Sequence, residues 1–270
     1  MVVQHNLSAM NTNRQMGVVT SALQKSTEKL SSGYKINRAG DDAAGLSISE
    51  KMRSQIRGLN KASDNAQDGI SLIQVAEGAL NETHSILQRM NELATQAAND
   101  TNTSVDRQSI KDEIEQLNEE LDRISTTTQF NKQDLLTGGF SGKLQVGALK
   151  GQTMDVKISL AVSAKGLNVS AVEVSTNAKA GAAMQSIQDA IESVSKQRSK
   201  LGAIQNRLEH TINNLDTNAE NTQAAESRIR DTDMADEMVQ YSKNNILSQA
   251  GQSMLAQANQ QTQGVLSLLG

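Results

Sequence analysis

Residues 59–97 read LNKASDNAQDGISLIQVAEGALNETHSILQRMNELATQA, and this stretch decides the fold of the chain. Its apolar residues recur on a seven-residue repeat that only Gly69 and Thr83 interrupt. The repeat consists of Ala62, Ala66, Ile73, Ala76, Leu80, Leu87, Met90, Ala94 and Ala97. Such spacing predicts a long helix that packs against a partner helix as in a coiled coil. The small alanine positions would let that partner approach closely.

The helical pattern extends in both directions from this stretch. Towards the N-terminus it reaches Asp41 and Asp42, either of which is a good helix N-cap. About 55 residues at ~1.5 Å each then give a rod of roughly 80 Å. A shorter helix is expected over residues 110–124. A second seven-residue register runs from about Gly181 to Ile229 and predicts a partner of similar length.

One part of the sequence has a different period. Between residues 138 and 180, apolar and polar residues alternate, with glycines in the intervening turns. The alternating apolar residues are Leu144, Val146, Met154, Val156, Ile158 and Leu160. Period two is typical of half-buried strands, so a small β-hairpin region is expected here and nowhere else in the chain.

Both ends of the chain carry amphipathic helices, over about residues 3–30 and 234–268. The order of elements is nearly symmetric about the middle of the chain. The simplest closure therefore folds the second half back along the first. The expected fold class is mainly α: a long antiparallel coiled-coil-like helical bundle with a small β-hairpin region, and with the termini paired at one end.

The terminal stripes lack an obvious partner within one subunit. An isolated pair of helices buries too little apolar surface to offset the entropy lost when both are ordered. We therefore expect neighbouring subunits to cover these stripes, which is typical of an assembly subunit. The side chains expected to mediate assembly are Leu7, Met10, Leu23, Leu30, Leu247, Met254, Val265 and Leu268.

Composition disfavours several classes of function. The chain has 270 residues, a net charge of −4, 1% aromatic residues, and no proline or cysteine. The absence of cysteine excludes disulfides and thiolate metal sites, and the acidic balance argues against nucleic-acid binding. No apolar run approaches the roughly 20 residues of a membrane span. The first residues lack the pattern of a cleaved signal peptide, so a cytosolic location or another export route is expected.

No catalytic or metal-binding constellation is apparent. The acidic clusters at residues 41–42 and 231–237 lie at helix starts, where carboxylates cap the chain and complement the helix dipole. The three histidines, His5, His84 and His210, lie outside any zinc-binding motif. We therefore expect no catalytic residue, no metal ligand and no cofactor, and predict that the chain is not an enzyme.

Three segments closely resemble the signature of bacterial flagellins. They are EKLSSGYKINRAGDDAAG at residues 28–45, AAESRIRDTDM at 224–234 and NNILSQA at 244–250. The resemblance covers roughly residues 1–135 and 180–270. It implies a structural subunit that polymerises into the flagellar filament for motility, secreted through the flagellar export apparatus without a cleaved signal peptide.

The resemblance also implies a division into domains. Residues 1–40 and 232–270 would form the inner assembly domain, called D0. Residues 41–231 would form the helical rod, called D1, with its β-hairpin region near 138–180. The outer D2 and D3 domains of larger flagellins would be absent, because only about 40 residues separate the matching helices.

Two binding segments follow from the same resemblance. Residues 88–94, QRMNELA, are similar to the flagellin segment recognised by vertebrate Toll-like receptor 5. This implies Arg89, Leu93 and Glu113 as receptor contacts, while Asn91 stands where an arginine is common. The last helix resembles the part bound by the flagellin export chaperone. The implied chaperone contacts are Leu247, Met254, Leu255 and Leu268.

The implied partners are copies of the same chain, the export chaperone, the filament cap, hook–filament junction proteins and the host receptor. Two other interpretations are open at this point. A hook–filament junction protein shares the terminal helices of flagellins. A helical signalling or adaptor rod would share the long coiled-coil-like pair.

Overall fold

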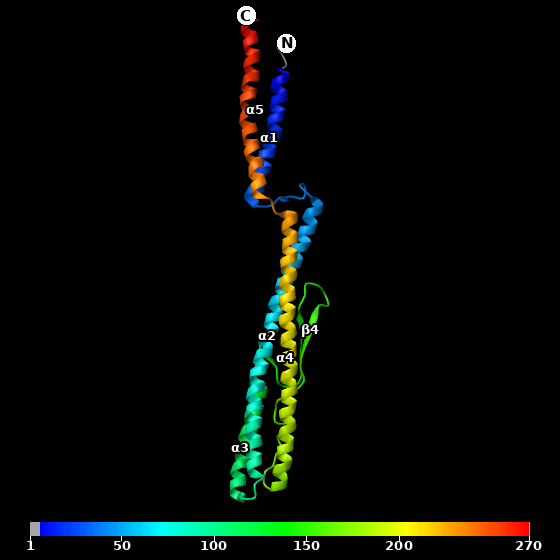
Figure 1. Cartoon of the computed structure of the whole chain (residues 1–270), viewed down its shortest axis with the longest axis vertical. Helices are drawn as coiled ribbons and strands as arrows, with labels where there is room; N and C mark the ends of the chain where they lie inside the picture. The colour runs from blue at the N-terminus through cyan, green and yellow to red at the C-terminus, as the bar shows by residue number, and fades with distance from the viewer. Residues whose placement is uncertain (1–5, 270) are drawn as a thin grey trace. The chain divides into compact units, whose positions relative to one another are not determined.

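The computed structural model describes the backbone of residues 6–269 and the side chains of residues 6–261. In chain order its elements are α1 (Leu7–Ser32), α2 (Ala43–Ala97), α3 (Ser104–Thr127), β1 (Gln129–Phe130), β2 (Gln133–Asp134), β3 (Phe140–Gln145), β4 (Thr153–Ile158), α4 (Asn177–Arg230) and α5 (Met234–Leu269) (Figure 1). The predicted fold class, mainly α with small β-hairpins, is confirmed.

Contacts divide the chain into two compact units. The second unit is Arg57–Ala219, and the first holds the described residues on either side of it. The long helices α2 and α4 each contribute to both units. None of the helices, as far as the structure describes them, is long and apolar enough to cross a membrane.

The second unit is built on an antiparallel pair formed by α2 and α4. The Ser63 hydroxyl donates to Asp216 over 3.0 Å, and Glu77 forms an ion pair with Arg198 at 3.8 Å. As numbers rise along α2, their partners on α4 fall, so the two helices run in opposite directions. All nine positions of the predicted repeat on α2 are buried. The periodicity therefore identified the packed face of α2 correctly.

The two interruptions of that repeat have separate structural reasons. Thr83 is fully buried, and its hydroxyl donates to the carbonyl of Ala79 in the same helix over 2.9 Å. Gly69 makes room for the β-hairpin. A Cβ atom at this position would lie 2.3 Å from Leu144 Cδ1, which is shorter than any real contact. The glycine therefore lets β3 pack directly on α2.

The antiparallel hairpin of β3 and β4 follows the predicted alternation. Phe140 pairs with Ile158, and Gln145 pairs with Thr153. Along β4 every second side chain is buried, and the buried ones are Met154, Val156 and Ile158. These three residues belong to the main hydrophobic core of the second unit.

The β-structure differs from the prediction in one respect. A second, very short hairpin pairs β1 with β2 ahead of residue 138, across a turn in which Asn131 and Lys132 have φ of 48° and 62°. The expectation of strands only between 138 and 180 was therefore wrong. Two-residue strands are too short to show alternation, and the turn residues were their sole signal.

The first unit pairs α1 with α5 (Figure 1). The Asn6 side chain donates to the Ala258 carbonyl over 2.9 Å, and Lys29 forms an ion pair with Glu237 at 3.4 Å. The helices are therefore antiparallel, and the described parts of both chain ends lie in this unit. Gly33 ends α1 in the left-handed conformation, with φ of 76°, which glycine adopts without strain.

Aspartates cap the N-termini of α2 and α5 in this unit, and Asn6 caps α1. Asp42 accepts from the Gly45 N–H over 2.9 Å at the start of α2, as expected. Asp233 accepts from the Ala235 N–H over 2.9 Å at the start of α5. Asp41 instead binds the preceding loop, because its carboxylate accepts hydrogen bonds from the backbone N–H groups of Asn37 and Arg38. The hydrogen bond from the Arg38 backbone lowers the pKa of Asp41 and keeps it ionised.

Candidate functional site

Large exposed apolar side chains concentrate on the terminal helical pair. On α1 and α5 these side chains are between 44% and 71% exposed. We call them the outer surface of the pair, and they are Leu7, Met10, Val18, Met234, Met238, Val239, Ile246, Leu247 and Met254. A concentration of large exposed apolar side chains on one part of a protein commonly marks an interaction site.

On α1 the inner and outer faces are clearly separated. Met16 lies against Gly251 of α5: its Cβ is 3.9 Å from the position that a Cβ atom at residue 251 would occupy. Leu23 and Leu30 follow Met16 at seven-residue intervals and are half-buried, so they share its face. Leu7 and Met10 lie on the opposite side and are 71% and 66% exposed. The residues predicted for assembly thus occupy two different faces of α1.

On α5 the exposed apolar residues surround most of the helix. Counting about 100° per residue, Met238, Ile246 and Leu247 point in clearly different directions. Among the described side chains of α5, those on the side of Leu255 and Ala258 are the ones that α1 covers. A helix that carries apolar side chains in several directions is suited to packing against more than one partner. The predicted residues Val265 and Leu268 lie outside the described side chains.

Charged residues of this pair gather near its linker end and are nearly absent from the rest of it. From residue 244 to the end of the sequence there is no Asp, Glu, Lys or Arg, and Gln, Asn and Ser supply the polarity. Between Leu7 and Gln24, Arg14 is the one charged residue. Neutral polar side chains can be buried between helices without the desolvation penalty of ions. The composition of the pair is therefore suited to close packing on several sides.

Two linkers adjoin this pair: residues 33–42 between α1 and α2, and residues 231–233 between α4 and α5. A cluster of side chains that the sequence did not predict holds them. The Arg230 guanidinium lies 4.7 Å from the centre of the Tyr34 ring and donates to Glu50 over 2.7 Å. The two linkers also pair through their backbones, because the Lys35 N–H donates to the Arg230 carbonyl over 2.7 Å. In the sequence Tyr34 stood out only as part of the signature at residues 28–45. Its aromatic ring, in a chain with so few, was the available signal.

The segment at residues 88–94 presents an exposed charge network. Arg89 donates to Glu113 of α3 through Nε over 3.0 Å, and to Glu92 through Nη1 over 3.1 Å. The hydrogen bond with Glu113 raises the pKa of Arg89, which stays positively charged. The structure therefore brings Arg89 and Glu113 together. Leu93, by contrast, is only 2% exposed and packs in the core beneath them.

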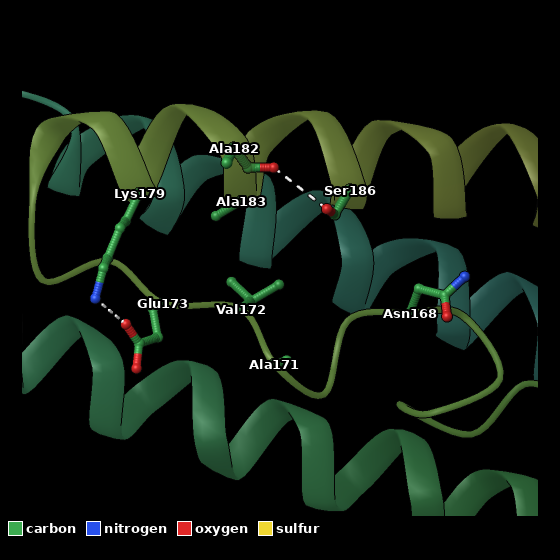
Figure 2. Close-up of a pocket in the computed structure, with 8 residues that line it drawn as sticks. All are labelled: Asn168, Ala171, Val172, Glu173, Lys179, Ala182, Ala183 and Ser186. Carbon is green, nitrogen blue, oxygen red and sulfur yellow. Dashed lines mark hydrogen bonds and ion pairs between the residues drawn. The ribbon is translucent and has the colours of Figure 1, made fainter.

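A shallow cavity of about 320 Å³ lies between α4 and the loop that precedes it (Figure 2). Lys179 and Glu173 form an ion pair at its edge, and the Ser186 hydroxyl donates to the Ala182 carbonyl over 3.2 Å. Small aliphatic side chains form much of the remaining lining. The two charged residues of this lining are paired with each other, and the Ser186 hydroxyl is bound to a backbone carbonyl, so the cavity presents no activated nucleophile. Across the described residues there is likewise no cluster of three His, Cys, Asp or Glu that could hold a metal ion.

Comparison with known proteins gives a consistent result over the whole chain. The model of the bacterial flagellin N-terminal helical region matches residues 3–141, and that of the C-terminal helical region matches residues 184–269. The chain is 56% identical to a flagellin of Halalkalibacterium halodurans and 51% identical to a flagellin of Bacillus subtilis, with complete coverage of both chains in each case. The crystal structure of Bacillus cereus flagellin is 34% identical, with a TM-score of 0.51, and covers 60% of this chain and 94% of that one.

The predicted resemblance is confirmed by these matches, including the short form. Residues 128–176, which join α3 to α4, lie within the second unit, and no separate outer domain is inserted there. A filament subunit has to pack against other copies and needs no catalytic site, which matches the exposed apolar side chains of α1 and α5. The chain therefore belongs to the bacterial flagellin family, and it is a structural subunit of the extracellular flagellar filament, not an enzyme.

Proposed function

We propose that this subunit polymerises mainly through the outer surface of its terminal helical pair. In this proposal, residues 1–40 and 232–270 form the assembly domain and residues 41–231 form the rod. The supporting observation is the set of nine large apolar side chains that α1 and α5 leave exposed in the single subunit. Their burial between copies would contribute roughly 1.5–3 kcal/mol for each fully buried side chain.

The surrounding copies are the natural partners for this surface. Because apolar side chains surround most of α5, more than one neighbouring pair is needed to cover it, and a helical polymer supplies several neighbours to each subunit. From residue 244 onward α5 carries no charge, so this part of identical copies does not repel at close range.

Seeded polymerisation tests this function. Purified chain added to short filament fragments should form long helical tubes, visible by electron microscopy. Removal of residues 240–270 should abolish them, because it removes most of α5. Circular dichroism of the truncated chain should still report a folded helical second unit. A full-length chain that stays monomeric on intact seeds would overturn the proposal.

Length of the polymer separates a filament subunit from a hook–filament junction protein. A junction protein stops after a short segment, whereas a filament subunit continues to add. The full-length identity to flagellins favours the filament subunit. The filament cap and the junction proteins would then contact the two ends of this polymer.

Export provides a second proposed partner. A chaperone that masks Leu247 and Met254 would cover side chains that are 44% and 57% exposed. Leu255 is half-buried on the side of α5 that faces α1. A chaperone that also contacts Leu255 must therefore separate α5 from α1. We further propose export without cleavage of a signal peptide, which N-terminal sequencing of filament protein would check.

Recognition by Toll-like receptor 5 is proposed for the Arg89 segment. Arg89 and Glu113 are about half exposed and would contact the receptor directly. Leu93 would contribute by fixing the α2 backbone from the core. We expect Arg89→Ala to weaken binding of the receptor ectodomain about tenfold, the size of a moderate interface hot spot.

Arg123→Ala is the matched control for this prediction, because Arg123 makes a similar exposed ion pair with Glu120. Surface plasmon resonance with the monomeric chain gives both affinities under the same conditions. Equal affinities of the Arg89→Ala variant and the unmodified chain would remove Arg89 from the contact set.

A further inference from the structure

Methionine holds all of the sulfur in this chain, and among the described residues the most exposed methionines lie on the terminal helices. The sequence has ten methionines and neither cysteine nor tryptophan. In the second unit, Met90 and Met154 are 0% and 8% exposed. On the terminal pair, four methionines are between 47% and 66% exposed: Met10, Met234, Met238 and Met254.

These four thioethers form two groups along the pair. Met234 and Met238 are about one helical turn apart at the start of α5. Met254 and Met10 lie farther along the pair, near the hydrogen bond that Asn6 of α1 donates to α5. Each of the four sulfur-bearing side chains belongs to the outer surface. A change at both groups would therefore affect the surface along much of its length.

We propose that these four methionines are a peroxide-sensitive modification site of the unassembled subunit, and that their oxidation prevents its addition to the filament. This inference rests on the proposed function. Hydrogen peroxide transfers one oxygen atom to each sulfur: its O–O bond breaks, an S=O bond forms, and water is released. The sulfur is oxidised by two electrons and the peroxide is reduced by two.

The product explains the block. A sulfoxide replaces a flexible apolar thioether with a polar, chiral group. Its oxygen must lose water when a neighbouring copy packs over it, and that loss is unfavourable unless a donor is in place. In the filament the same side chains are covered by neighbours. The sensitive form is therefore the free subunit, and assembled subunits are protected.

Peroxide treatment of free subunit and of finished filaments tests this inference. Peptide mass spectrometry should show the four exposed methionines oxidising on the order of tenfold faster than Met90 and Met154 in free subunit, since oxidation follows exposure. In filaments this difference should shrink. Seeded polymerisation of the oxidised subunit should fail, and treatment with methionine sulfoxide reductase should restore it.

The matched variant replaces Met10, Met234, Met238 and Met254 by leucine, a change that conserves volume in apolar contacts. It should polymerise before and after peroxide. Loss of its polymerisation after peroxide would place the sensitive groups elsewhere and overturn the inference. So would normal growth of the fully oxidised natural chain. If the leucine variant does not grow untreated, rescue of the natural chain by the reductase decides the matter. Untreated natural chain that does not grow would instead contradict the proposed function.

Discussion

Replacing Ile246 by aspartate is expected to abolish filament formation while the subunit stays folded. Ile246 is 66% exposed in the subunit and lies at the middle of the outer surface on α5. Because the side chain has little to lose from the single subunit, the substitution should change the free energy of unfolding by no more than about 0.5 kcal/mol. In a polymer the same carboxylate would be buried, with Lys243 at i−3 on the same helix as a neighbouring cation.

The size of the effect follows from desolvation. Burial of a charge is unfavourable by several kcal/mol, and pairing of the new carboxylate with Lys243 would require that this ammonium group also lose its water. In addition, every subunit of the polymer carries the same defect, so it acts at each addition step. A loss of even 3 kcal/mol per step raises the critical concentration more than a hundredfold.

Light scattering after seeding gives the critical concentration of the Ile246→Asp variant, and electron microscopy shows its product. Ile246→Leu is the control, because it keeps an apolar side chain of nearly the same volume and should grow normally. Growth of Ile246→Asp at the rate of the unmodified chain would show that this part of α5 is not covered by neighbours.

The success of the sequence prediction was greatest where one face of a helix meets one partner. On α2 the seven-residue repeat identified the residues that pack on α4, and Asp42 capped the helix as expected. The repeat did not reveal that α2 is covered on more than one side. Leu93 and Leu72 lie outside the repeat, yet they are 2% and 8% exposed. Periodicity reports the dominant buried face and is silent about additional partners.

The linker cluster shows a second limit. Arg230, Tyr34 and Glu50 come from three separate segments, and their contact depends on how α4 and the two linkers fold back. No local spacing encodes such a contact. The same holds for Arg89 and Glu113, which the resemblance implied but helical periodicity alone would treat as ordinary solvated charges.

The second large effect is expected in the core of the rod. Leu80 is fully buried in the seven-residue repeat of α2, within the main hydrophobic core of the second unit. We expect Leu80→Ala to lower the free energy of unfolding of this unit by about 2–5 kcal/mol, because it removes apolar contacts and leaves a cavity. Urea unfolding of the monomeric chain, followed by circular dichroism, measures the change.

Val75→Ala is the matched control on the same helix, since Val75 is 42% exposed. Its effect should stay within about 0.5 kcal/mol, because solvent already covers much of the side chain. Both substitutions introduce alanine, the residue with the highest helix propensity, so neither can destabilise α2 through propensity. Equal destabilisation would mean that packing on partner helices stabilises Leu80 no more than Val75. If the two changes in the free energy of unfolding differ by several kcal/mol, the stability of the rod comes from the buried face that the seven-residue repeat forms on α2. The outer surface of the terminal helices has no part in that buried face and remains available to bind other copies.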